Sequence, residues 1–178
     1  MANDFVKGKQ QFTYSPGFQK GFMLHRAIDA FTDAHPATKA LKAFFAPQYR
    51  LYAGAFADVV YDHFLACDTS IFPTPEDLSQ FAATTYHTLD QFEASLPSGF
   101  ARMLPYMRKQ DWLYHYRFTT GIEQSFNGLV RRATYLTESA IAYQIFLNNY
   151  AAMGNCYANF FPELKNHSIY QLQQLLAD

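Results

Sequence analysis

The chain has 178 residues, of which 49% are hydrophobic, 18% aromatic and 16% charged. This length and composition predict one domain over residues 1–178 with a core rich in Phe and Tyr, and they exclude a disordered protein. The formal net charge of -1 excludes a general electrostatic attraction to nucleic acid or to an anionic membrane. An acidic partner would therefore have to meet a local basic patch.

Two cysteines, Cys67 and Cys156, lie far apart and form no CxxC motif. We expect both to be free thiols in a reducing compartment. No apolar run approaches the length of a membrane span, and the N-terminus lacks an apolar signal segment. We therefore expect a soluble, cytoplasmic protein.

Helical periodicity dominates the chain, and no strand-like alternation of useful length is present. A first strong helix should run to about Asp33 and end before Pro36. Further helices are expected over 37–45 (ended by Pro47), 50–67, 75–95 (with Thr74 as N-cap), 100–109, 111–118 and 123–136. A last apolar stripe over 146–160 should break at Pro162, and Ser168 should cap a short terminal helix. These elements predict an all-α fold, a single-domain helical bundle.

The first helix carries ionisable residues at every fourth position: His25, Asp29 and Asp33. This spacing places the three side chains on one face of a helix, beside an apolar stripe at positions 24, 28 and 31. Imidazole and carboxylate groups are ligands that transition metals accept. The alternative is an ordinary amphipathic helix with a His–Asp contact, and this helix taken alone favours that alternative.

The segment 58–66, D-V-V-Y-D-H-F-L-A, contains Asp58 and Asp62 one helical turn apart, with His63 beside Asp62. We expect both acids on the inward side of this apolar helix. Buried carboxylates are costly unless they are paired or bind a cation. Two helices that each hold His and Asp at turn spacing leave two alternatives open: a metal site, or a cluster whose members satisfy one another.

Other kinds of site have less support in the sequence. There is no G-x-S-x-G motif, no Gly-rich phosphate loop, and no basic neighbour that would activate either cysteine. The basic pairs Arg108–Lys109 and Arg131–Arg132 are either solvated helix faces or contacts for a phosphate or an acidic protein.

Three motifs closely resemble those of the acyl carrier protein phosphodiesterases. They are A-N-D-F-V-K-G at 2–8, L-H-R-A-I-D-A-F-T-D-A-H-P at 24–36, and the 58–66 segment above. Weaker matches follow at 108–116 and 127–132, so the resemblance spans essentially the whole chain. That family is described as an unorthodox branch of the HD-domain metal-dependent phosphohydrolases, which implies an HD-domain-like helical fold.

The resemblance implies an enzyme that removes 4'-phosphopantetheine from holo-acyl carrier protein with the help of a divalent metal ion. The ion would be Mn²⁺, with Mg²⁺ or another transition metal as alternatives. The implied metal ligands are His25, Asp29, Asp62 and His63. Asp4 would be a ligand or general base, and Asp58 would orient a histidine. Arg26 would either face the substrate phosphate or form a surface ion pair. The acidic carrier protein would dock on Arg108, Lys109, Arg131 and Arg132.

One departure from the family pattern concerns the N-terminus. Family members begin with a short helix carrying an L-A-H motif upstream of the position of Asp4, whereas this sequence starts inside what resembles the second motif. We therefore expect a misplaced start codon or a truncated product. Two other functions stay open: a phosphohydrolase of a small nucleotide or phosphoester, and a non-catalytic helical binding module.

Overall fold

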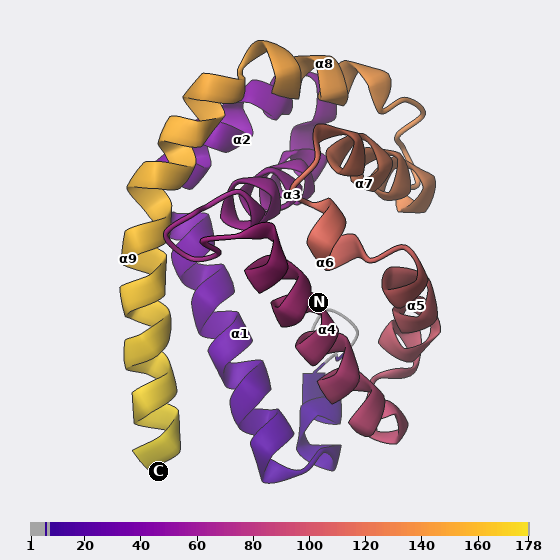
Figure 1. The fold of residues 1–178 in the computed structure, drawn as a ribbon, viewed down its shortest axis with the longest axis vertical. Coiled ribbons are helices and arrows are strands. Elements are labelled where there is room, and N and C mark those ends of the chain that lie inside the picture. Colours follow the sequence, from indigo (N-terminus) through magenta and orange to yellow (C-terminus); the bar gives the residue numbers. More distant parts are fainter. Residues whose placement is uncertain (1–5, 7, 178) are drawn as a thin grey trace.

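The computed structural model describes residues 6 and 8–177, and all regular structure in this part of the chain is helical (Figure 1). The all-α prediction is thereby confirmed, while the likeness to HD domains stays a prediction. In chain order the elements are η2 (Gly8–Thr13), α1 (Pro16–Ala34), α2 (Pro36–Tyr49), η3 (Arg50–Tyr52), α3 (Ala53–Ala66), α4 (Pro75–Gln91), η4 (Glu93–Ser95), α5 (Ser98–Lys109), α6 (Trp112–His115), α7 (Thr119–Arg132), α8 (Ala140–Asn148) and α9 (Tyr150–Ala177).

The main core surrounds α3, which packs against α2, α7 and α9 (Figure 1). Its centre is aromatic: the Phe56 ring stacks on Phe45 at 5.5 Å between centroids and meets Phe126 edge-to-face at 4.9 Å. All three side chains are fully buried. Such offset and edge-to-face pairs add to the free energy gained by burying the rings. The helix that carries Asp62 and His63 is therefore held from several sides.

A second, smaller core joins α4 and α5. Tyr86, Phe100 and Met107 are buried there, and Phe18 of α1 packs against them. Leu113, on the short helix α6, packs against both cores. The segment around α6 therefore connects the two clusters.

Local sequence explains where α4 and α2 begin. Thr74 caps α4 as predicted: its Oγ1 accepts from the backbone N–H of Asp77, whose carboxylate accepts in return from the N–H of Thr74. This reciprocal capping box satisfies two backbone donors that the helix leaves unpaired. At α2, His35 is the N-cap, because its Nδ1 accepts from the N–H of Ala37 at 3.2 Å.

The two helix ends that were predicted at Pro47 and Pro162 are wrong. Helix α2 continues for two residues beyond Pro47, and α9 passes through Pro162 without a break. Pro162 is exposed, so the carbonyl group that loses its partner can face water. The apolar stripe is instead interrupted at Asn149, whose Nδ2 donates to the carbonyl oxygen of Ile145 at the end of α8.

The prediction for Ser168 is also wrong. This residue lies within α9, and its hydroxyl donates to the carbonyl oxygen of Leu164 one turn earlier instead of capping a new helix. Cys67 and Cys156 are free thiols, as expected. Among the helices of residues 8–177, none has the length and apolar character needed to cross a membrane.

Candidate functional site

The ionisable row on α1 divides into two groups. His25 Nδ1 lies 2.9 Å from Asp29 Oδ2, and both side chains are partly exposed. Asp33 instead forms an ion pair with Lys42 of α2, with 2.5 Å between Oδ1 and Nζ. The predicted contact between His25 and Asp29 is therefore present, whereas Asp33 connects α1 to α2.

Arg26 lies next to His25 in sequence, but its guanidinium reaches to the short helix η2. Its Nη1 donates to the side-chain oxygen of Gln11 at 2.6 Å. The partner is a neutral amide, so the positive charge of Arg26 is not compensated by this contact. Its expected contact with a substrate phosphate stays a prediction.

Asp62 is the acid of α3 that lies in the interior. The side chain is half-buried, and burial raises the pKa of Asp62 from 3.8 to about 7, with the nearby Asp58 carboxylate adding to the rise. Side-chain hydrogen bonding with Tyr116 opposes this rise. Asp58 itself is exposed, so the prediction that both acids face inward is wrong for Asp58. Four residues rotate a side chain by about 40° beyond one full turn, and here this separates the core edge from solvent.

His63 is almost completely buried, with 1% of its surface exposed. Its Nδ1 donates to the backbone carbonyl of Tyr116 at 2.7 Å, and its Nε2 accepts from the Tyr150 hydroxyl at 2.9 Å. Burial lowers the pKa of His63, which favours this neutral form. Both ring nitrogens therefore have protein partners.

Tyr116 is the residue that sequence reasoning missed. It lies directly after α6, and its backbone carbonyl binds His63. Its buried side chain interacts with Asp62 and hydrogen bonds with Ser125 of α7, and burial raises the pKa of the Tyr116 hydroxyl. A tyrosine in the aromatic run W-L-Y-H-Y offers no sequence signal that separates this role from ordinary core packing.

The His and Asp side chains of α1 and α3 are of the types that bind metal ions, but the described residues are not arranged around one point. Over residue 6 and residues 8–177, no three His, Cys, Asp or Glu side chains lie together as a ready metal site. Asp4, one of the expected participants, lies outside the described residues. The crowding of Asp62 by Asp58 is nevertheless an arrangement that a bound cation would relieve, and His25 and Asp29 add donors of the right kind. The approach of His25 and Asp62 to one ion stays a prediction.

The expected docking residues lie at the ends of α5 and α7, which Figure 1 shows on the same side of the molecule. Arg108 is paired with Asp90 of α4, with 2.5 Å between Nη1 and Oδ2. Arg132 Nη1 lies 4.0 Å from the sulfur of Met103, so the end of α7 reaches α5. Lys109 and Arg131 are exposed.

The comparison that decides the family is a match to the model of the acyl carrier protein phosphodiesterase family over residues 1–164. The chain belongs to this family. It is 28% identical over 179 residues to the acyl carrier protein phosphodiesterase of Photorhabdus laumondii, with 96% of this chain and 88% of that protein covered. It is 27% identical over 161 residues to the enzyme of that name from an Enterobacter strain, with 90% and 83% covered. For the Yersinia pestis protein of the same name, the identity is 26% over 161 residues, again with 90% and 83% covered. No solved structure is significantly similar to the chain.

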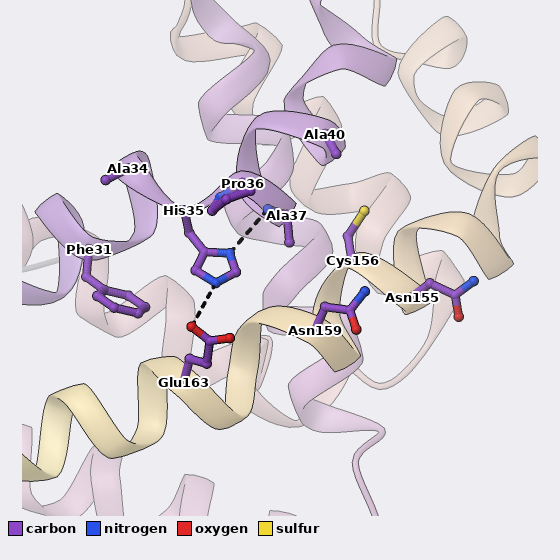
Figure 2. Close-up of a pocket in the computed structure, with 10 residues that line it drawn as sticks. All are labelled: Phe31, Ala34, His35, Pro36, Ala37, Ala40, Asn155, Cys156, Asn159 and Glu163. Carbon is purple, nitrogen blue, oxygen red and sulfur yellow. Dashed lines mark hydrogen bonds and ion pairs between the residues drawn. The ribbon is translucent and has the colours of Figure 1, made fainter.

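In this member of the acyl carrier protein phosphodiesterase family, an open groove of about 810 Å³ lies away from the residues above. Figure 2 shows it between the junction of α1 with α2 and the facing side of α9. His35 stands in the groove, with Nε2 3.4 Å from a carboxylate oxygen of Glu163. None of the predicted metal ligands lines this groove. The family match ends at residue 164, so the last turns of α9 lie beyond it.

Proposed function

We propose that the protein hydrolyses the phosphodiester that links 4'-phosphopantetheine to a serine of holo-acyl carrier protein. Water adds across the bond between phosphorus and the serine oxygen: its hydroxyl stays on phosphorus and its second proton goes to the serine. The products are apo-acyl carrier protein and 4'-phosphopantetheine. The observation that carries this proposal is the family match over residues 1–164, which includes both helices that hold the candidate ligands.

The residues proposed to hold a divalent metal ion are His25 and Asp29 on α1 and Asp62 on α3, with Asp4 as a further ligand or as the general base. When bound, an ion such as Mn²⁺ lowers the pKa of its water and offsets charge on the phosphate. Asp62 suits this role because its raised pKa of about 7 leaves a large ionised fraction at neutral pH, and a neighbouring cation favours the ionised form further. Asp58, exposed one turn away, adds negative charge to the same region.

The proposed docking surface consists of Arg108, Lys109, Arg131 and Arg132. These side chains are exposed at the ends of two helices that meet through the contact of Arg132 with Met103. Acyl carrier proteins are small and acidic, so exposed basic side chains would raise the rate of encounter. Salt screens such contacts over about 8–10 Å at physiological ionic strength, so the affinity should fall as salt rises.

The direct test is to incubate the purified protein with holo-acyl carrier protein and Mn²⁺ and to follow the mass of the carrier protein. We expect conversion to the apo form, and EDTA should stop it. A panel of nucleotides and simple phosphoesters is assayed beside it. Hydrolysis of a panel member with no change in the carrier protein would replace the proposed substrate. No hydrolysis of any kind, with no rise in Tm on adding Mn²⁺, would indicate a binding module.

The docking surface is tested by charge reversal. We expect Lys109→Glu together with Arg131→Glu to raise KM for the carrier protein and to leave kcat nearly unchanged, because neither residue belongs to the proposed metal site. Lys39→Glu, at an exposed position of α2, is the matched control and should leave KM unchanged. Equal effects of the two variants, or a KM independent of salt, would refute the docking surface.

A further inference from the structure

The surroundings of His63 define how its ring can act. The partner of Nδ1 is a carbonyl oxygen, which only accepts, so Nδ1 carries the ring proton. The only lone pair of the ring is then on Nε2, and the Tyr150 hydroxyl lies 2.9 Å from it. The rings of Phe146 and Tyr150 pack edge-on against the imidazole at 5.4 and 5.5 Å between centroids. The Tyr150 hydroxyl and the Cys67 sulfur, which lies 4.0 Å from Nε2, therefore occupy the approach by which a metal ion would reach this nitrogen.

The other end of the His63 contact fixes Tyr116. Its backbone carbonyl is held by the imidazole, and its side chain extends to Asp62 and to Ser125. The chain just before Tyr116 is also held from α7, because a Cβ atom at Gly121 would lie 2.1 Å from the carbonyl oxygen of His115. Such a close approach fits only glycine. The peptide that carries Tyr116 is therefore clamped between α3 and α7.

We propose that His63 is a positioning residue and not a metal ligand, and that it acts by holding Tyr116 so that the tyrosine hydroxyl orients the Asp62 carboxyl. This inference rests on the proposed function only in treating Asp62 as a metal ligand. The two adjacent residues of α3 thereby have different roles: Asp62 binds the metal ion at the candidate site, and His63 faces the core and positions Tyr116. Tyr116 connects them from outside the helix.

The effect of this arrangement on metal affinity can be inferred from other groups that orient metal ligands. A hydroxyl that donates to one carboxylate oxygen restricts the rotation of the carboxyl and leaves the second oxygen directed outward. Loss of a partner of this kind typically weakens metal binding by about 10–100-fold. Loss of a ligand itself is expected to weaken it further.

Two substitutions separate the roles of His63. His63→Gln retains N–H donors and an oxygen acceptor at this position, but no imidazole remains. We expect the Mn²⁺ Kd of this variant, measured without substrate by electron paramagnetic resonance of free Mn²⁺, to stay within about tenfold of the wild type, at the weak end of a positioning effect. His63→Leu removes both hydrogen bonds and should weaken Mn²⁺ binding far more. A folded His63→Gln variant that binds Mn²⁺ as poorly as Asp62→Asn would overturn the proposal.

The hydroxyl of Tyr116 is tested by Tyr116→Phe, which keeps the ring and the backbone carbonyl. We expect the Mn²⁺ Kd to rise by about 10-fold or more while the circular dichroism spectrum stays unchanged. Tyr135→Phe, at a side chain that is 84% exposed, is the matched control and should bind Mn²⁺ as the wild type does. Unchanged Mn²⁺ binding in Tyr116→Phe would remove the tyrosine from the proposal.

A metal-free measurement keeps the inference separate from the proposed function. Urea midpoints in EDTA are compared for Tyr116→Phe, Asp62→Asn and the double variant. A contact between the two side chains predicts shifts that are not additive, whereas additive shifts would refute the contact. Failure of the wild type to act on holo-acyl carrier protein would refute the proposed function and leave this result standing.

Discussion

Replacing Asp62 by asparagine should stabilise the metal-free protein above pH 7. Burial, aided by Asp58, raises the pKa of Asp62 from 3.8 to about 7. Between these two pH values the folded chain binds more protons at this site than the unfolded chain, so wild-type stability falls as the pH rises through that interval. At about 1.4 kcal/mol for each pKa unit, the loss is at most about 4 kcal/mol and is complete above pH 7.

The assay is urea unfolding in EDTA at pH 5 and pH 8. The wild type should lose more stability between the two pH values than Asp62→Asn, which carries no charge to desolvate. Glu123→Gln, at an exposed position of α7 outside the proposed metal site, is the control and should follow the wild type. Adding Mn²⁺ at pH 8 should stabilise the wild type and leave Asp62→Asn unchanged. Parallel pH profiles for the wild type and Asp62→Asn would refute the reasoning about this carboxyl.

Three further predictions concern the framework and are checked by urea unfolding. Gly121→Ala should lower the free energy of unfolding by more than about 2 kcal/mol, because its Cβ would lie 2.1 Å from the carbonyl oxygen of His115. In the same helix, a Cβ at Gly128 meets no atom within 4 Å, so Gly128→Ala should raise the free energy of unfolding by up to about 1 kcal/mol. Equal effects would contradict the close approach. Thr74→Ala removes the capping box of α4 and should cost about 1 kcal/mol. Tyr49→Phe should lower the free energy of unfolding by about 1–3 kcal/mol, because it removes the hydroxyl that accepts from the buried N–H of Ala142 at 2.8 Å. A smaller decrease would indicate that another group accepts from this N–H.

The sequence predicted the helical architecture well because the apolar periodicity is strong and the caps are local. Thr74 illustrates this, since its spacing to Asp77 is sufficient to define the start of α4. The prolines were harder to interpret. Whether Pro162 ends a helix depends on whether the unpaired carbonyl before it can reach water, and that depends on the exposed face of the finished fold.

The site was predicted in part. The contact between His25 and Asp29 follows from their spacing on one helix, and the structure places them together. The roles of Asp58 and His63 depend on which face of α3 is turned toward the core. Because α3 has apolar residues on nearly every side, its sequence does not reveal that face. Tyr116 could not be found from local patterns, because its partners His63 and Ser125 come from two other helices. Convergence of distant residues is a property of the packing.

The proposed docking surface extends over the two cores that Leu113 joins, because Arg131 and Arg132 end α7, a helix of the larger core. Lys109 ends a helix of the smaller cluster, whereas Asp62 belongs to the helix at the centre of the larger one. A carrier protein seated on all four basic side chains would thus contact both packing units. The short helix α6, whose Leu113 joins the two units, leads directly into Tyr116, so the residue that contacts Asp62 lies at their junction.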